Sequence, residues 1–454
     1  MSLAVVILAA GKGTRLKTTV PKPLVPFASG TLLAMSLRNA YSLSPNKIIV
    51  VVGHQSELVE DEATRCMKIF GHSSVNLVCL KQTEQKGTGH ALMVALPELH
   101  NYKRALVLYA DSPLLQVHTL TKLLQAKAKL VYLGAKIDNP TGYGRIVLKG
   151  KTIQSITEER DCNASMKKNK LVNSGVIIAE VPLLERYLKG IKPNKLNGEY
   201  YLTDLAALAK CAQLVIASDS EEILGVNSLD ELHRQAKVYE HRIALEALRK
   251  GLFIADVNNT HIRSYSSQFV FGVNCTIDTG CVIIGKVILG DNVRIEPYCV
   301  LINVTIGSGS LIRSFSHLDG VTIGAGVTVG PYARLRPGTV LSDAARVGNF
   351  VEIKKSTIGA GSKVNHLSYI GDTTIGKNVN IGAGTITCNY DGKQKHTTTI
   401  GNDVFVGSGV ELVAPVTLED RVVIGAGTTV RRSVEPDTLV VGQPTQKTIS
   451  KRNK

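Results

Sequence analysis

The chain has 454 residues, of which 44% are hydrophobic and 20% are charged, a composition typical of globular domains with buried cores. No apolar run reaches the roughly 18 residues that a membrane span needs, which excludes an integral membrane segment. The formal net charge of +16 is spread along the chain without zinc-finger or RNA-recognition spacing, so it favours phosphate-bearing small molecules over nucleic acid as partners.

The first half of the chain alternates short aliphatic runs with amphipathic stretches. The aliphatic runs predict buried strands at 5–9, 48–52, 75–80, 105–109 and 131–135, with helices between them, as at 32–43 and 89–96. This alternation predicts an α/β domain with a Rossmann-like, mostly parallel sheet covered by helices. Ligands of such sheets bind at the carboxyl ends of the strands.

A glycine-rich loop follows the first predicted strand directly. Residues 8–16 read LAAGKGTRL, and residues 21–24 read PKPL. Gly11 and Gly13 would let backbone amides approach a triphosphate closely. Arg15 and Lys22 supply positive charge that can stabilise a leaving pyrophosphate. The spacing of these two segments resembles the signature of sugar-phosphate nucleotidyltransferases.

Further motifs resemble the same family in the same order. Residues 82–91, QTEQKGTGHA, resemble its uracil-binding segment. Tyr109-Ala110-Asp111 resembles a Y-G-D turn whose aspartate holds magnesium, although the family has glycine where this chain has Ala110. The resemblance implies nucleotide contacts at Leu8, Ala9, Gly11, Gly13, Lys22, Gln82, Gly87 and Thr88, sugar contacts at Tyr109, Gly144, Glu158, Asn173 and Asn227, and a magnesium site at Asp111 and Asn227.

These resemblances imply that the uridylyl group of UTP is transferred directly, without a covalent enzyme intermediate. The phosphate of N-acetylglucosamine 1-phosphate would attack the α-phosphorus of UTP, and pyrophosphate would leave against Arg15 and Lys22. Taken singly, Asp111 is also consistent with a helix cap, and Asn173 and Asn227 with turn residues.

Residues 229–252 predict one charged amphipathic helix. We interpret it as a linker between a nucleotidyltransferase domain at 1–228 and a second domain at 253–454. Throughout the second domain, aliphatic residues recur at every sixth position, and a small residue often follows them. This period predicts a left-handed parallel β-helix of hexapeptide repeats, with the aliphatic residues inside and tight turns at the corners. The in-phase positions are Ile323, Val329, Leu335, Leu341, Val347, Ile353, Ile400, Val406, Leu412, Leu418, Ile424 and Val430.

Residues 387–396 break this period. Insertions in repeat folds form loops on one face and often carry binding groups. The segments RPG at 336–338, HLSY at 366–369 and NYDG at 389–392 resemble the acetyltransferase half of a bifunctional family, the N-acetylglucosamine-1-phosphate uridylyltransferase / glucosamine-1-phosphate N-acetyltransferases. That resemblance extends from Leu8 to Lys447.

Acetyl transfer from a thioester to an amine needs a base with a pKa near neutrality, and His366 is the candidate. The family assembles this site between neighbouring β-helices of a homotrimer, so the resemblance implies trimerisation. The family also has an arginine near the C-terminus that holds a CoA phosphate, where this chain has Gln443. The resemblance implies acetyl-CoA contacts at Ala383, Ser408 and Ala426, and sugar-phosphate contacts at Arg336, Lys354, Tyr369, Asn380, Asn389, Tyr390 and Lys395.

Together these patterns predict a magnesium-dependent enzyme that makes UDP-N-acetylglucosamine, a precursor for the cell envelope, in two steps. Acetyl-CoA and glucosamine 1-phosphate would serve the first step, and UTP the second. The alternatives are a nucleotidyltransferase with a purely structural β-helix, and a non-enzymatic scaffold. The eight cysteines form no C-x-x-C pair and no basic region precedes the first apolar stretch, so we expect a cytoplasmic protein.

Overall fold

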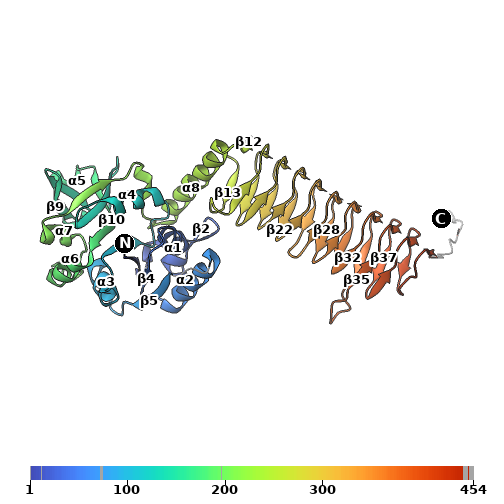
Figure 1. Cartoon of the computed structure of the whole chain (residues 1–454), viewed down its shortest axis with the longest axis horizontal. Coiled ribbons are helices and arrows are strands. Elements are labelled where there is room, and N and C mark those ends of the chain that lie inside the picture. Colours follow the sequence, from blue (N-terminus) through green and yellow to red (C-terminus); the bar gives the residue numbers. More distant parts are fainter. Residues whose placement is uncertain (1, 12, 72–74, 196, 443–447, 449–454) are drawn as a thin grey trace, which may run out of the picture. The chain divides into compact units, whose positions relative to one another are not determined.

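The computed structural model describes residues 2–11, 13–71, 75–195, 197–442 and 448 (Figure 1). Gln443 and the basic C-terminal tail lie outside the described residues. The chain divides into two compact units, residues 1–237 (unit 1) and 238–454 (unit 2). The division falls inside helix α8, Leu229–Arg249, which occupies the region predicted as the linker helix.

Among its described residues, unit 1 contains a nine-stranded sheet in the order β5-β4-β1-β6-β10-β7-β11-β9-β8. The strands are β1 Leu3–Ala9, β4 Lys47–Val52, β5 Asn76–Lys81, β6 Arg104–Tyr109, β7 Leu130–Lys136, β8 Arg145–Lys149, β9 Thr152–Thr157, β10 Leu171–Glu180 and β11 Gln213–Ile216, with a separate small hairpin of β2 Pro26–Phe27 and β3 Gly30–Thr31. The helices are α1 Leu32–Ser42, α2 Ser56–Phe70, α3 Thr88–Ala95, α4 Val117–Gln125, α5 Ala164–Lys167, α6 Val181–Tyr187 and α7 Asp204–Ala209.

The centre of this sheet is parallel, as the sequence predicts. β1 pairs in parallel with β4 and β6, and β4 pairs in parallel with β5. β10 differs, because it runs antiparallel to both β6 and β7. Every residue of β1 is buried, and alternate side chains enter the hydrophobic clusters on opposite faces of the sheet. The carboxyl ends of β1, β4 and β6 therefore share one edge.

Unit 2 is a stack of coils with three parallel sheets, which form its three faces. Face 1 contains β12 Phe253–Ile254, β15 Thr276–Ile277, β18 Arg294–Ile295, β21 Leu311–Ile312, β24 Thr328–Val329, β27 Arg346–Asn349, β30 Lys363–His366, β33 Asn380–Ile381, β36 Phe405–Val406, β39 Val423–Ile424 and β41 Leu439–Val440. Face 2 contains β13 His261–Arg263, β16 Val282–Ile284, β19 Val300–Ile302, β22 His317–Asp319, β25 Arg334–Leu335, β28 Glu352–Lys354, β31 Tyr369–Gly371, β34 Ile386–Cys388, β37 Glu411–Val413 and β40 Thr429–Val430. Face 3 contains β14 Phe269–Phe271, β17 Val287–Leu289, β20 Thr305–Ile306, β23 Thr322–Ile323, β26 Val340–Leu341, β29 Thr357–Ile358, β32 Thr373–Ile375, β35 Thr398–Ile400 and β38 Val416–Leu418.

The hexapeptide period is confirmed by burial. All of the in-phase positions named from the sequence point into the core, and none is more than 4% exposed. The predicted insertion leaves the coil between β34 and β35 as a short hairpin, in which Tyr390 and Lys395 form an antiparallel bridge (Figure 1). None of the helices among the described residues has the length and apolar character that a membrane span requires.

Neighbouring residues of β26 offer a matched test of this core. Leu341 is 1% exposed and points inward, whereas Val340 is 39% exposed and points outward. We expect Leu341→Ala to lower the free energy of unfolding of unit 2 by about 2–5 kcal/mol, because it leaves a cavity in a stacked core. Val340→Ala should change it by less than about 1 kcal/mol. Urea unfolding followed by circular dichroism measures both, and equal effects would contradict the inward assignment.

Candidate active sites

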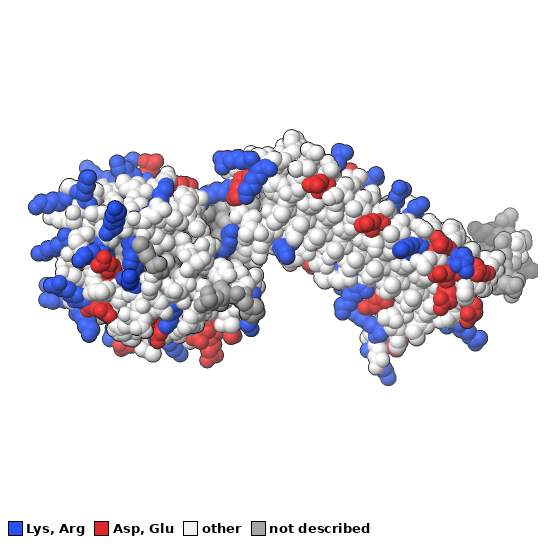
Figure 2. Space-filling view, viewed as in Figure 1, with Lys and Arg blue, Asp and Glu red and all other residues white. Residues whose placement is uncertain are grey.

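A pocket of about 980 Å³ opens in unit 1 beside the carboxyl ends of β1 and β6. The glycine-rich loop after β1 and the turn after β6 both contribute to its wall. On the face of unit 1 shown in Figure 2, Lys and Arg are the prevailing charged side chains. The predicted site residues that line the pocket are Leu8, Ala9, Gly11, Gly13, Arg15, Lys22, Gln82, Gly87, Thr88, Tyr109, Asp111 and Asn227.

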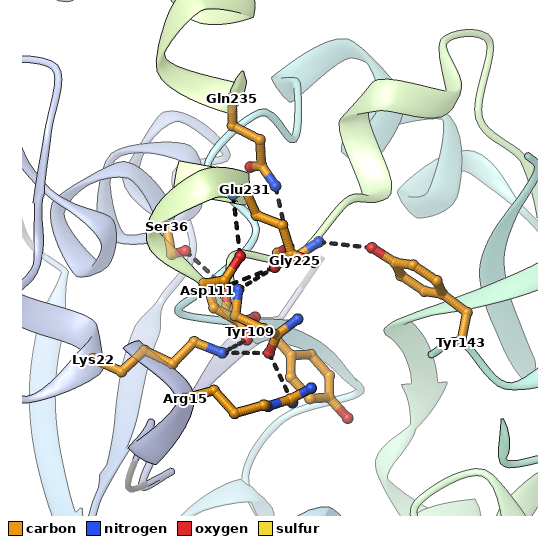
Figure 3. A network of polar contacts seen from close by, with 11 residues as sticks. Arg15, Lys22, Ser36, Tyr109, Asp111, Tyr143, Gly225, Glu231 and Gln235 are labelled. Atoms are coloured by element: carbon orange, nitrogen blue, oxygen red, sulfur yellow. Dashed lines mark hydrogen bonds and ion pairs between the residues drawn. The ribbon is translucent and has the colours of Figure 1, made fainter. Parts of the chain in front are cut away.

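Lys22 is the centre of the polar contacts in this pocket (Figure 3). Its ammonium group forms an ion pair with the Asp111 carboxylate and donates to Asn227 Oδ1 at 3.0 Å. Arg15 Nη2 donates to the same amide oxygen at 3.2 Å. Oxygen atoms of Asp111 and Asn227 thus converge on one cation.

The start of helix α8 fixes Asn227. Glu231 Oε2 accepts from the backbone N–H groups of Asn227, at 2.6 Å, and Ser228, at 3.2 Å. Ser228 Oγ accepts in return from the Glu231 N–H at 3.2 Å, which makes a reciprocal capping box. The N–H of Val226 also donates to the Asp111 carbonyl at 2.8 Å. Asp111 and Asn227 are therefore held together by the backbone, although 116 residues separate them in the sequence.

This pair fits a divalent cation. Carboxylate and amide oxygens are ligands that magnesium accepts, and magnesium commonly takes only one or two protein ligands and completes its shell with water and substrate phosphates. The described residues contain no group of three or more His, Cys, Asp or Glu side chains arranged to hold a metal ion. Ala110 adopts no left-handed backbone conformation, so this turn does not require the glycine of the family motif.

Two glycines shape the loops around the pocket. Gly13 has a φ of +61°, and a Cβ added there would lie 2.5 Å from Lys22 Cβ. Gly87 has a φ of +92°, and a Cβ there would lie 2.8 Å from the Tyr200 carbonyl. Only glycine combines this left-handed backbone with so close an approach.

Gln82 is 3% exposed and held by its amide nitrogen. That nitrogen donates to the Gly87 carbonyl at 3.2 Å and lies 2.9 Å from His90 Nδ1. With the nitrogen so occupied, the amide oxygen of Gln82 is available as an acceptor for a ligand in the pocket.

Gly144, Glu158 and Asn173 do not line this pocket. They form a neighbouring cluster, in which the Asn173 N–H donates to the Gly144 carbonyl at 2.9 Å and Thr203 Oγ1 donates to Glu158 Oε1 at 2.9 Å. Burial raises the pKa of the Glu158 carboxyl, and burial also raises the pKa of the Tyr109 phenol, which borders the cluster.

Sequence reasoning missed several residues of unit 1. Arg160 and Glu199 line the pocket, and Arg160 forms no ion pair with any described residue. Arg160 stands two positions after Glu158, a predicted sugar contact, and this proximity in the sequence could have identified it. His90 and Glu231 position Gln82 and Asn227. The Ser-x-x-Glu spacing of residues 228–231 was a signal for Glu231, because it is typical of a capping box, whereas only the folded chain shows the contact of His90.

His366 is the last residue of β30, at the corner between face 1 and face 2 of unit 2. Its side chain is exposed, and its Nδ1 lies 3.2 Å from Asn349 Oδ1 on the preceding coil. Because the amide oxygen can only accept, we assign the proton to Nδ1. Nε2 then carries the free lone pair.

Two lysines form a second group of candidate substrate-binding residues in unit 2. Lys354 lies on face 2, and Lys395 lies in the insertion. The neighbouring Lys354 ammonium lowers the pKa of Lys395, since two like charges disfavour each other. Asn389 Nδ2 donates to Asp372 Oδ2 at 2.5 Å, which ties the base of the insertion to the coil. Two adjacent ammonium groups of this kind favour an anion between them.

The remaining predicted residues occupy neighbouring coils. Arg336 Nη1 donates to Glu352 Oε1 at 2.8 Å, and the register of β25 and β28 places Arg336 one coil from Lys354. Tyr369 begins the strand after His366, whereas Tyr390 donates to the Gly392 carbonyl at 2.8 Å within the hairpin. No contact joins His366 to the two lysines among the described residues. Asn380 lies on face 1, and Ala383, Ser408 and Ala426 lie at the same corner as His366 on three successive coils.

A second pocket, of about 550 Å³, borders His366 on face 1. Arg313, Arg346 and Asn349 line it, and sequence reasoning named none of them. Arg313 follows β21, whereas Arg346 and Asn349 both lie on β27. The six-residue period aligns Asn349 with His366, one coil away, but only the folded chain shows that these side chains border one pocket.

Family models match both units. A MobA-like NTP transferase domain matches residues 5–163, a GMPPB C-terminal domain matches residues 266–349, and six bacterial transferase hexapeptide repeats match residues 397–432. Among solved structures, UDP-glucose pyrophosphorylase in complex with UDP-glucose aligns at 20% identity and a TM-score of 0.43, covering 53% of this chain and 100% of its own.

Similar proteins span nearly the whole chain. The bifunctional protein GlmU of Herminiimonas arsenicoxydans is 43% identical over 451 residues, covering 98% of this chain and 97% of its own. The proteins of the same name from Methylobacillus flagellatus and Janthinobacterium sp. are 43% and 42% identical, each over 98% of this chain and over 96% and 97% of their own lengths.

The two glycines of the loop after β1 should respond differently to substitution. Gly13→Ala should lower the free energy of unfolding of unit 1 by about 1–2 kcal/mol, because alanine is strained at a positive φ and its Cβ meets Lys22. Gly11 lacks a positive φ, and a Cβ there meets nothing within 4 Å. Gly11→Ala should therefore change stability by less than about 0.5 kcal/mol. Chemical unfolding of both variants measures the difference, and similar losses would argue against the loop conformation.

Glu158 should make stability depend on pH. Its folded-state pKa is raised above 4.5, so the folded chain holds a proton that the unfolded chain releases first. This contribution is fully present below pH 4.5 and is lost as the pH rises through the folded pKa. Unfolding measured across that range should show a decline in stability that Glu158→Gln lacks. Identical pH profiles for the two proteins would refute the assignment.

Proposed function

The chain belongs to the family of bifunctional GlmU proteins, and we propose that its two units catalyse consecutive steps in the synthesis of UDP-N-acetylglucosamine. Unit 2 transfers acetyl from acetyl-CoA to the amine of glucosamine 1-phosphate. Unit 1 then transfers the uridylyl group of UTP to N-acetylglucosamine 1-phosphate and releases pyrophosphate. The observation that carries the proposal is the presence of two separate sites, one with a cation-binding pair beside a glycine-rich loop and one with an oriented histidine.

In unit 1, the sugar phosphate needs no general base, because its oxygen is already anionic. The chain therefore acts through positioning and charge. Backbone amides of the loop at Gly11 and Gly13 face the triphosphate, and Arg15 and Lys22 take up the negative charge of the leaving pyrophosphate. The pocket cation Arg160 is a further phosphate contact.

Nucleobase recognition is assigned to the same pocket, and sugar recognition to Tyr109 and the neighbouring Glu158 cluster. The free amide oxygen of Gln82 suits the N3–H donor of uracil, and Gly87 and Thr88 continue this wall. Leu8 and Ala9 at the end of β1 border the nucleotide. Tyr109, Gly144, Glu158 and Asn173 are assigned to the sugar, with the buried Glu158 cluster behind Tyr109.

Nucleotidyl transfer in this family uses a divalent metal ion, and we propose magnesium held by Asp111 and Asn227. When bound, the ion supplies positive charge that neutralises the substrate phosphates. Until the ion binds, the Lys22 ammonium satisfies the same two oxygen atoms. Glu231 keeps Asn227 in place through the capping box at the start of α8.

In unit 2, the oriented imidazole acts as the general base. Asn349 holds the proton on Nδ1, which leaves Nε2 of His366 to remove a proton from the attacking amine. Cations on face 2 and the insertion hold the substrate phosphate, and the small residues at the corner leave room for the pantetheine arm. The proposed substrate contacts are Arg336, Lys354, Tyr369, Asn380, Asn389, Tyr390 and Lys395, and the acetyl-CoA contacts are Ala383, Ser408 and Ala426.

The substrates belong to the sugar-phosphate and nucleotide class, and the hexapeptide repeats point to an oligomer. We propose a homotrimer that acts in the cytoplasm. A nucleotidyltransferase with a structural β-helix is the alternative. The His366–Asn349 pair and the lysine pair weigh against it, because a structural coil needs neither.

Substitutions in each site should separate the two activities. His366→Ala should reduce free thiol release from acetyl-CoA with glucosamine 1-phosphate by about 100-fold or more, because the amine loses its base. Pyrophosphate release from UTP should persist. Asp111→Asn should have the opposite pattern, with pyrophosphate release lost and thiol release kept. Absence of glucosamine 1-phosphate-dependent thiol release from the parent protein would favour the alternative.

A further inference from the structure

Gly225 stands two residues before Asn227 and borders both proposed metal ligands. A Cβ added at Gly225 would lie 3.8 Å from Asp111 Cγ and 3.8 Å from Asn227 Nδ2. The backbone that follows is held at each residue. The Val226 N–H donates to the Asp111 carbonyl at 2.8 Å, and the Asn227 N–H donates to Glu231 Oε2 at 2.6 Å. The position of Gly225 therefore helps to determine where the side chain of Asn227 lies.

Two side chains hold Gly225, one at its N–H and the other at its carbonyl (Figure 3). The Gly225 N–H donates to the Tyr143 hydroxyl oxygen at 3.2 Å, and Gln235 Nε2 donates to the Gly225 carbonyl at 3.1 Å. Tyr143 belongs to the loop before β8, whereas Gln235 lies on α8, one turn after Glu231. Neither of them lines the pocket of unit 1. We call Tyr143 and Gln235 the Gly225 clamp.

Gln235 is a costly residue for the place that it occupies. Its side chain is 1% exposed, and its Oε1 atom has no hydrogen-bond partner among the described residues. A buried polar atom without a partner lowers stability, and an apolar side chain of similar size avoids that loss. Side chains that break a packing rule in this way are expected where function selects them. The bond to the Gly225 carbonyl is the contact that such a function would use.

Tyr143 connects the same glycine to the sugar cluster. The Tyr143 carbonyl accepts from Arg145 Nη1, and Arg145 Nη2 pairs with Glu159 Oε2 at 2.6 Å. Arg145 is 1% exposed, so this anchor is enclosed by protein. The residue after Tyr143 is Gly144, whose carbonyl accepts from the Asn173 N–H at 2.9 Å. Tyr143 is thus fixed by its backbone to the predicted sugar contacts and by its hydroxyl to the segment of a metal ligand.

We propose that Tyr143 and Gln235 are positioning residues, which hold Asn227 where it can bind the metal ion. Tyr143 in addition fixes the separation between this ligand and the sugar subsite. Neither residue needs to touch a substrate, because both act through the backbone of Gly225. The inference rests on the proposed function for the identity of the metal ion and of the sugar. It adds the contacts that align the two subsites, and in-line transfer depends on such alignment.

The two members of the clamp should differ in one respect. Gln235 acts on the metal ligand alone, because its bond to Gly225 reaches no predicted sugar contact. Tyr143 acts on both subsites, because it also carries the backbone next to Gly144. Loss of the Tyr143 hydroxyl should therefore weaken metal binding and raise the KM for N-acetylglucosamine 1-phosphate. Loss of the Gln235 amide should weaken metal binding and leave that KM unchanged.

The test uses the full chain and Mn²⁺ as the probe. Mn²⁺ accepts the same oxygen ligands as Mg²⁺, and the electron paramagnetic resonance signal of the free ion measures how much is bound. Tyr143→Phe removes the hydroxyl alone, and Gln235→Leu replaces the amide by an apolar side chain of similar size. The matched control is Tyr239→Phe, which removes a buried hydroxyl in unit 2 that donates to the Ser264 carbonyl at 2.9 Å. Thermal unfolding checks that every variant is folded.

Tyr143→Phe and Gln235→Leu should each weaken Mn²⁺ binding by about tenfold or more, as is usual when the outer contacts of a metal ligand are lost, and the control should stay within about twofold of the parent. Of the three variants, Tyr143→Phe alone should raise the KM for N-acetylglucosamine 1-phosphate, measured by pyrophosphate release at saturating Mn²⁺. Thiol release by unit 2 should stay at the parent level in all of them. A parent that binds no Mn²⁺, or parental Mn²⁺ affinity in either clamp variant, would overturn the proposal. An equal KM in the two clamp variants would overturn the additional role of Tyr143.

The outcomes also separate the clamp from the proposed function. A parent that releases no pyrophosphate from UTP, but whose Mn²⁺ affinity depends on Tyr143 and Gln235, would refute the uridylyl-transfer assignment and leave the clamp standing. An active parent whose two clamp variants bind Mn²⁺ as the parent does would refute the clamp and leave the uridylyl-transfer assignment standing.

Discussion

Parallel strand pairing in register is the constraint on which both units depend. In unit 1, it brings the carboxyl ends of β1, β4 and β6 to one edge, so that the glycine loop and Asp111 meet in one pocket. In unit 2, it stacks equivalent residues of successive coils at the spacing between neighbouring strands. Columns of side chains arise from this stacking, as in the stacked rings of Tyr298, Phe315, Tyr332 and Phe350. Side chains on loops and corners carry the chemistry, and the sheets determine where those loops and corners lie.

Both sites concentrate positive charge where substrate phosphates are expected, by different means. In unit 1, Lys22 is paired with Asp111 and Asn227, while Arg160 has no ion-pair partner among the described residues. In unit 2, Lys354 and Lys395 lie side by side, and their repulsion lowers the pKa of Lys395. In unit 1, Lys22 stays paired with Asp111 until a substrate or a metal ion replaces one partner of the pair. The lysine pair of unit 2 leaves a local excess of positive charge, which an anionic ligand relieves.

One corner of the β-helix departs from the residue types that its left-handed turns usually hold. Most left-handed turn positions hold Gly, Asn or Asp, which tolerate that backbone at low cost. The corner between face 1 and face 2 holds Tyr298, Phe315, Tyr332 and Phe350 instead, and His366 lies on the coil that follows Phe350. Such departures are expected at functional sites, because function selects the side chain even when the backbone does not.

The sequence by itself determined the features that repeat or that are local. The six-residue period predicted the β-helix and its inward-facing residues, because every coil buries the same position, and the LAAGKGTRL segment predicted a glycine-rich loop directly after β1. Tertiary structure alone decided contacts between distant segments. The antiparallel course of β10, the hydrogen bond between Asn349 and His366 and the entry of Arg160 into the pocket have no local signature. The four stacked aromatic residues are 17 or 18 positions apart, and three hexapeptides make one coil, so the period indicates that they align. Only the folded corner shows that their rings stack, remain half exposed and lead to His366, because stacking and exposure depend on how neighbouring coils pack.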